Sequence, residues 1–190
     1  MYFDFFKLHD GSFGVVIAEP LQSRLETPIY IATLRGTIRA LIRGQEKFSL
    51  PTFLSTLNRL VQEDPIQQQY KFAFLNLSPT RDELNFLSWG FGNLLHFSPG
   101  GQLPRILTNN HPPLGTNKWE DLELTIDNWN IGDVVVLHSC DSSQDELIQQ
   151  SLKENFLLSP QNQADTFLKK ISSQSSEKKT KVLFTIHRIG

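Results

Sequence analysis

Short apolar runs separated by turn residues predict most of the strands in this chain. The predicted strands cover residues 2–7, 13–18, 70–77, 83–89, 93–98, 122–126, 133–138 and 182–189. Between the first two, Asp10 and Gly11 form a dipeptide that is typical of a hairpin turn. The run 14–18 is apolar at every position, which predicts a strand that is buried on both faces.

Apolar residues that recur every three or four positions predict helices elsewhere. The predicted helices cover residues 27–43, 49–61, 145–154 and 159–171. Pro28 falls in a first helical turn, where proline is tolerated, and Ser49 is the expected N-cap of the second helix. The serine-rich stretch from Ser172 to Ser176 predicts a mobile loop. This order of elements indicates an α+β domain with two mainly antiparallel sheets and helices outside them.

Composition narrows the class of protein further. A chain of 190 residues with 39% hydrophobic residues is typical of one globular domain. A net charge of −2 gives no positive field for a nucleic-acid backbone, so we expect no nucleic-acid partner. Because no long apolar run or secretion signal is present, we expect no membrane segment and a cytoplasmic location. The single cysteine, Cys140, excludes an internal disulfide and a thiolate-rich zinc site.

Several residues suggest chemistry, and each also has a simpler structural interpretation. His138 and Cys140 are two positions apart, so they share one face if the strand continues. No motif lowers the pKa of the thiol, which favours a half-buried structural cysteine over a nucleophile. His111 lies in a polar loop and is expected to be solvated. Residues 89–92 read as a tight turn with its rings in the core rather than as a stacking platform.

A basic stripe on the first predicted helix is the clearest candidate contact surface. Arg35, Arg39 and Arg43 are spaced four residues apart and therefore lie on one face. The simpler interpretation is a solvated helix face. The alternative is a contact with a phosphate or an acidic partner.

A series of short motifs follows in a fixed order along almost the whole chain. They lie at residues 4–6, 14–19, 32–35, 49–60, 83–91, 113–115 and 131–139. In this order and spacing they resemble the motifs of the SpoIIE/RsbU-type domain of metal-dependent (PPM, PP2C-like) serine/threonine protein phosphatases. The resemblance implies a single domain over residues 1–190, an α-β-β-α sandwich whose first strand is trimmed.

The resemblance also implies a pair of Mn²⁺ or Mg²⁺ ions held by carboxylates, which would activate water for hydrolysis of a phosphoserine or phosphothreonine. Met1 stands where one family ligand is expected, and Glu19 retains a carboxylate at another. At the third position an ungapped match places Cys140, and a one-residue bulge would place Asp141. At the fourth, Lys178 and its neighbour replace the acidic pair, so two ammonium groups stand where carboxylates are expected.

Soft or cationic side chains serve hard divalent ions poorly. We therefore expect a degenerate member of the family, a pseudophosphatase with no cofactor that acts by binding a protein in signalling. The partner that the resemblance implies is an anti-sigma-factor antagonist-like protein or a kinase-like regulator, and a homodimer or an oligomerisation module is left open.

The alternative is an active Mn²⁺- or Mg²⁺-dependent phosphatase that uses Glu19 and Asp141, with further ligands from Asp4 or Asp10.

Overall fold

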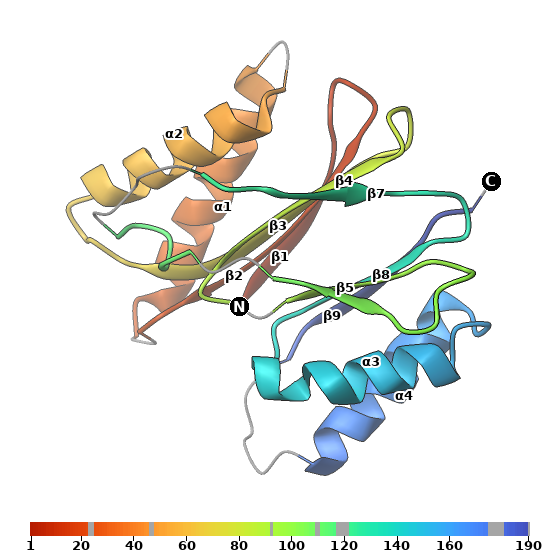
Figure 1. The fold of residues 1–190 in the computed structure, drawn as a ribbon. Coiled ribbons are helices and arrows are strands. Elements are labelled where there is room, and N and C mark those ends of the chain that lie inside the picture. Colours follow the sequence, from red (N-terminus) through yellow and green to blue (C-terminus); the bar gives the residue numbers. More distant parts are fainter. Residues whose placement is uncertain are drawn as a thin grey trace. The chain divides into compact units, whose positions relative to one another are not determined.

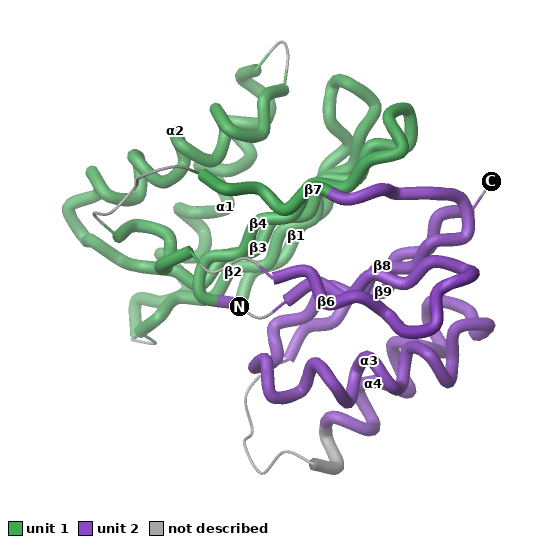
Figure 2. The backbone as a smooth tube through the Cα atoms, in the orientation of Figure 1, with its two compact units in different colours: residues 1–90, 109–126 green, residues 91–108, 127–190 purple. Residues whose placement is uncertain are grey.

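The computed structural model describes residues 1–22, 25–45, 48–91, 93–108, 111–116, 122–174 and 181–189. The chain divides into two compact units, drawn in two colours in Figure 2. Unit 1 consists of Met1–Gly90 and Asn109–Ile126, and unit 2 of Phe91–Thr108 and Asp127–Gly190. Each unit therefore combines two stretches that are separated in the sequence.

Unit 1 contains four strands and the start of a fifth. These are β1 (Tyr2–Lys7), β2 (Phe13–Pro20), β3 (Tyr70–Ser78), β4 (Glu83–Trp89) and β7 (Thr125–Asn128), in the spatial order β1-β2-β3-β4-β7. From β1 to β4, consecutive strands pair antiparallel. The predicted burial of β2 is confirmed, because Val15, Val16 and Ile17 expose at most 2% of their surface.

Two helices cover one face of this sheet, as Figure 1 shows. They are α1 (Thr27–Gly44) and α2 (Leu50–Glu63). On α1 the buried residues Leu34, Ile38 and Ile42 are spaced four apart and pack with the aromatic residues of β3 in one core cluster. Ser49 is at the N-cap of α2 as predicted, but its hydroxyl contacts the Thr52 hydroxyl instead of a backbone N–H.

Unit 2 has its own antiparallel sheet and helix pair. The strands β5 (Leu94–Phe97), β6 (Arg105–Leu107), β8 (Val134–His138) and β9 (Leu183–His187) are ordered β6-β5-β8-β9. After the short 3₁₀ helix η1 (Ser142–Gln144), helices α3 (Asp145–Glu154) and α4 (Pro160–Gln174) pack on one face of this sheet. Side chains from β5, β8, α3 and α4 form a single core cluster there.

The predicted fold class is confirmed, since the chain is α+β with two antiparallel sheets and four α-helices among the described residues. One strand was missed, and two local predictions were wrong. Strand β6 was not predicted, β7 begins at Thr125 rather than Leu122, and the helical turns of α4 continue through Ser172 to Gln174, where a loop was expected. The remainder of the serine-rich stretch lies outside the described residues. Within the described part of the chain, no helix has both the length and the apolar character needed to cross a membrane.

Candidate functional site

The carboxylate of Glu19 lies near the end of strand β2 in unit 1. Glu19 pairs with Lys71 of β3, and the strand continues through Pro20, which pairs with Tyr70. The Leu21 N–H then donates to the carbonyl of Gln69 at 3.0 Å, and the backbone bends at Leu21 and Gln22. Pairing with β3 therefore continues up to Pro20, directly after Glu19.

The third expected ligand position follows strand β8 in unit 2. Cys140 is only 3% exposed, and burial raises the pKa of its thiol above the ordinary value. Cys140 is therefore buried more fully than the half-buried structural cysteine that was predicted, and the group at this position is a neutral thiol. Asp141 is exposed, and its carbonyl accepts the Gln144 N–H at 2.9 Å at the start of η1.

These donor types do not fit a pair of hard divalent ions. Met1 offers only a thioether, Cys140 a buried protonated thiol, and Lys178 and Lys179 lie outside the described residues. Within the residues that the structure describes, no group of three or more His, Cys, Asp or Glu side chains is arranged to hold a metal ion.

Asp4 is a further metal ligand that an active phosphatase would use. In the structure it forms an ion pair with Arg39 of helix α1. Its Oδ2 accepts hydrogen bonds from Arg39 Nε at 2.8 Å and from the Tyr2 hydroxyl at 3.0 Å, and Arg39 Nη2 lies 2.6 Å away. Its Oδ1 accepts the Phe5 N–H at 2.9 Å. Burial acts to raise the pKa of Asp4, but the bonds from Arg39, Phe5 and Tyr2 outweigh it, and the pKa lies below its ordinary value.

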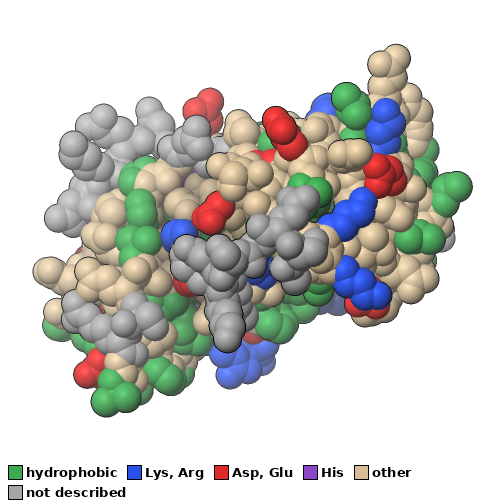
Figure 3. Space-filling model, turned by 90° about the horizontal axis from the view of Figure 1, so that it is seen from below, with side chains coloured by type: hydrophobic (Ala, Val, Ile, Leu, Met, Phe, Trp, Pro, Cys, Tyr) green, Lys and Arg blue, Asp and Glu red, His purple; other side chains and the backbone are tan. Residues whose placement is uncertain are grey.

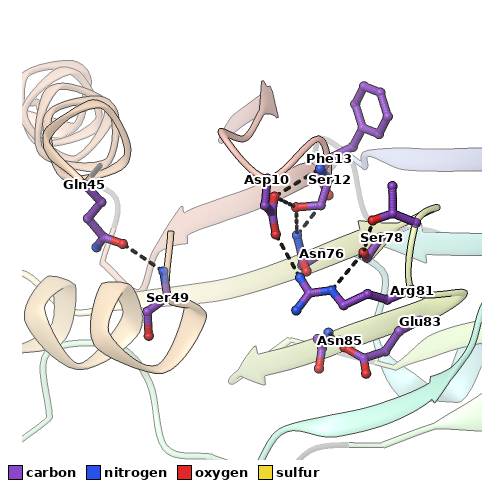
Figure 4. A network of polar contacts seen from close by, with 11 residues as sticks. Asp10, Ser12, Phe13, Gln45, Ser49, Asn76, Ser78, Arg81, Glu83 and Asn85 are labelled. Carbon is purple, nitrogen blue, oxygen red and sulfur yellow. Dashed lines mark hydrogen bonds and ion pairs between the residues drawn. The ribbon is translucent and has the colours of Figure 1, made fainter. Parts of the chain in front are cut away.

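Asp10 is similarly engaged at the turn between β1 and β2, as Figure 4 shows. One oxygen accepts the backbone N–H and the hydroxyl of Ser12, at 3.0 and 2.6 Å, and the other lies 2.8 Å from Arg81 Nη2. Arg81 also donates to the Ser78 hydroxyl at 3.1 Å, and Asn76 donates to the Ser12 hydroxyl at 2.9 Å. The network fastens the β1–β2 turn to the β3–β4 turn.

The three arginines of the predicted stripe have different surroundings. Arg39 is half-buried against Asp4, and its guanidinium lies 5.7 Å from the centre of the Phe6 ring. Arg35 approaches the same carboxylate only to 4.0 Å, with 56% of its side chain exposed. Arg43 is exposed in the last turn of α1. On the face drawn in Figure 3, basic and acidic side chains are interspersed.

Unit 2 contains a buried polar cluster that the sequence pattern did not predict. His96 on β5 has a fully buried side chain, with Nδ1 2.9 Å from Asp127 Oδ2 and Nε2 3.0 Å from Asp133 Oδ2. Arg105 Nη2 lies 2.6 Å from Asp127, and the Asn130 N–H donates to Asp133 at 2.7 Å. Burial acts to raise the pKa of Asp127, but His96, the Asn128 N–H and Arg105 together lower it. Pattern alone carries no signal for the cluster, because its members come from three separate segments.

A second buried histidine lies at the end of β8. His138 Nε2 is 3.1 Å from Asp145 Oδ1, although the two atoms lack hydrogen-bond alignment, and neither has such a partner among the described residues. The other oxygen of Asp145 accepts a bond from the Asn93 side chain. His138 is therefore held near an acidic residue of α3, and no described contact joins it to Cys140.

The sequence motifs at residues 49–60 and 113–115 contact each other in unit 1. The side chain of Asn58, on α2, is buried and accepts the Gly115 N–H at 2.7 Å. Gly115 has a φ of +89°, and a Cβ there would lie 2.7 Å from Val61 Cγ1. Leu114, beside it, is fully buried and bridges to Tyr70. These motifs consequently act in packing.

Trp89 and His111 are the remaining candidates, and only Trp89 agrees fully with its structural interpretation. Trp89 is 1% exposed and packs against Phe72, as the core interpretation predicts. His111 forms an isolated bridge with Trp89 and has a ring nitrogen 3.0 Å from the Glu123 carbonyl, so it is less solvated than expected.

Comparison with known proteins supports the fold. No family profile matches the chain, and no curated protein sequence matches it either. The RsbU and RsbW domains of Rv1364c from Mycobacterium tuberculosis match at 16% identity with a TM-score of 0.81, over 98% of this chain and 55% of that one. The PP2C phosphatase domain of SpoIIE from Bacillus subtilis, with a fragment of its regulatory domain, matches at 14% identity and a TM-score of 0.71, over 97% and 56%.

RsbX in complex with magnesium matches at 15% identity and a TM-score of 0.69, over 96% of this chain and 84% of that one. Identities this low show the fold and no activity. The chain thus has the fold of PP2C-type phosphatase domains. Among these, it resembles the domains of RsbU and SpoIIE in structure, as the sequence motifs predicted.

Proposed function

We propose that residues 1–190 form one SpoIIE/RsbU-like domain that has lost the standard metal chemistry and acts by binding another protein in signalling. The observation that carries the proposal is the group at the third ligand position, where Cys140 is a buried thiol with a raised pKa. A neutral thiol contributes neither the charge nor the hard oxygen that Mn²⁺ or Mg²⁺ requires.

The ion pairs of Asp4 and Asp10 support the same conclusion. Asp4 and Asp10 form ion pairs with Arg39 and Arg81 within unit 1, so recruiting either as a metal ligand requires breaking a salt bridge. We infer that the protein partner is an anti-sigma-factor antagonist-like or kinase-like regulator, by analogy with structural neighbours that include the RsbU and RsbW domains of Rv1364c. The stripe of Arg35, Arg39 and Arg43 is the surface that we propose for this contact.

An active phosphatase is the second candidate function. Glu19 and Asp141 retain carboxylates at or beside two expected ligand positions, and Asp141 is exposed. RsbX, a neighbour in fold, was solved in complex with magnesium. If the chain is active, we propose Mn²⁺ or Mg²⁺ as its cofactor and a phosphorylated regulator as its substrate.

Calorimetric titration of the whole chain with Mn²⁺, together with hydrolysis of para-nitrophenyl phosphate, separates the two candidates. We expect no saturable pair of sites and no metal-dependent turnover. Two micromolar sites, with turnover that Glu19→Ala or Asp141→Ala abolishes, would contradict the pseudophosphatase. Glu63→Ala is a matched control, because this exposed glutamate on α2 is remote in sequence from both positions.

A further inference from the structure

Strand β1 lies at one end of the strand order in its sheet. The order begins β1-β2, so within the described residues β1 has a neighbouring strand on one side only. The Phe5 N–H donates to the Asp4 carboxylate, which places that backbone donor on the side away from β2. An edge of this kind can accept another extended segment, and the incoming carbonyl would replace the Asp4 contact.

The two faces of this edge have different chemistry. Because side chains alternate along a strand, Tyr2, Asp4 and Phe6 share the face that carries α1, where Asp4 meets Arg39. Phe3 and Phe5 lie on the other face, and each exposes more than half of its surface, 52% and 54%. The edge is therefore aromatic on one face and charged on the other.

The charged face carries an excess of positive charge. Helix α1 places Arg35, Arg39 and Arg43 at four-residue intervals, and Asp4 is the carboxylate that Arg39 and Arg35 approach. One carboxylate offsets one guanidinium, so two positive charges remain. Arg35 and Arg43 are the exposed members of the stripe.

We propose that β1 accepts an extended segment of another protein whose side chains alternate between acidic and apolar. In an added strand, every second side chain would point toward the arginines of α1, and the intervening ones would pack beside Phe3 and Phe5. Backbone bonds to β1 would supply affinity, and the alternation would supply specificity. The inference rests on the proposed function as a protein-binding domain and specifies the chemistry of its partner.

A labelled ten-residue peptide of alternating glutamate and valine tests the proposal by fluorescence anisotropy against the whole chain. We expect Arg35→Glu/Arg43→Glu to weaken its binding about tenfold or more, since close charge pairs are reversed. Arg59→Glu is the matched control: it reverses an exposed arginine on α2, with 63% of its side chain accessible, and should change the affinity less than about twofold.

Two further peptides separate alternation from charge alone. A peptide with five glutamates followed by five valines has the same composition and should bind at least about tenfold more weakly. A peptide of alternating lysine and valine should bind the doubly reversed variant better than it binds the original chain. Equal binding of the block peptide, an equal effect of Arg59→Glu, or no binding to the folded chain would overturn the proposal.

NMR chemical shifts of the backbone amides locate the peptide contact independently of the affinity measurements. We expect the largest changes on peptide addition at Phe3, Phe5 and Lys7, whose alternate positions match the outward donors of β1. Changes confined to other strands would also overturn the proposal. Failure of these peptide tests leaves the metal titration unaffected, so the strand contact and the pseudophosphatase can fail separately.

Discussion

Adding a single methyl group at Gly115 should destabilise the fold. Its φ of +89° is in the region that favours glycine, and an added Cβ would lie 2.7 Å from Val61 Cγ1. Backbone strain and overpacking each cost about 1–2 kcal/mol, so we expect Gly115→Ala to lower the free energy of unfolding by about 2–4 kcal/mol. Urea denaturation monitored by circular dichroism measures this loss.

Gly36→Ala is the control for that substitution. Gly36 is inside α1, and an added Cβ there would meet nothing within 4 Å. Alanine is favoured over glycine in a helix, so this variant should gain about 0.5–1 kcal/mol. A Gly115→Ala chain as stable as the original would show that the turn and α2 move apart easily, contrary to the packing described.

At the scale of elements, His96 joins segments that are far apart in the chain. Its ring on β5 lies between Asp127 of β7 and Asp133, which precedes β8. Replacing it by leucine leaves the carboxylate of Asp133, only 1% exposed, without its imidazole partner. Removing a hydrogen-bond partner from a buried polar group typically costs about 1–3 kcal/mol, and we expect His96→Leu to lose at least that much in urea denaturation.

A double variant distinguishes charge from packing at this cluster. His96→Leu/Asp133→Leu removes the buried Asp133 carboxylate as well. It should therefore recover part of the stability lost in His96→Leu, although the Asn130 N–H loses its acceptor. Strictly additive losses would mean that the His96–Asp133 contact contributes nothing to stability.

The spacing of apolar residues predicted those elements whose pattern lies within one continuous segment of the chain. Helix α3 begins and ends where predicted, at Asp145 and Glu154, because its apolar stripe and its flanking residues are all contained in one segment. Strand β2 was equally clear from its continuous apolar run. Strand β6 was missed because it has three residues, one of them the charged Arg105. Three residues give no readable alternation.

Side-chain partners that are distant in sequence could not be predicted. Asp4 and Arg39 are 35 residues apart, and only the packing of α1 on β1 brings them together. The candidate ligand positions came from motif order, and the burial of Cys140 agrees with the apolar strand that precedes it. The cluster around His96 depends on strand pairing, so a pattern of single residues does not reveal it.

At the scale of the whole molecule, several aspartates set the response to acid. Asp4, Asp10 and Asp127 all have a pKa below the ordinary value of 3.8, despite burial that acts to raise it. A lowered folded-state pKa contributes stability that is present above 3.8 and is lost as the pH falls through the folded value. We therefore expect the melting temperature to fall most steeply below pH 3.8.

Arg39→Gln tests how much of this acid response comes from Asp4. After burial, the hydrogen bond from Arg39 has the largest effect on the pKa of Asp4, so the variant should lose less stability on acidification than the original chain. Arg59→Gln, on α2, should retain the original acid response. Thermal scans from about pH 7 to about pH 2 compare the three chains, and identical acid limbs would contradict the role of this ion pair.

The alkaline response depends on a buried tyrosine in the same way, with the opposite sign. Burial, followed by the charge of Asp64, raises the pKa of Tyr70 from 10.0 to about 12. The unfolded chain ionises this phenol first, so its contribution is complete below pH 10 and is lost as the pH rises toward 12. That contribution is about 3 kcal/mol, since the pKa rises by about two units and each unit corresponds to about 1.4 kcal/mol.

Tyr70→Phe removes the ionisable group while keeping the ring, and it gives up only a 3.3 Å hydrogen bond to the Tyr30 carbonyl. Near neutral pH the variant should therefore be less stable than the original chain by no more than about 1 kcal/mol. Between pH 10 and 12 the original chain should lose stability faster, and the two unfolding curves should converge or cross. Urea denaturation across this range measures both slopes, and parallel losses would show that Tyr70 ionises equally readily in the folded and unfolded chain.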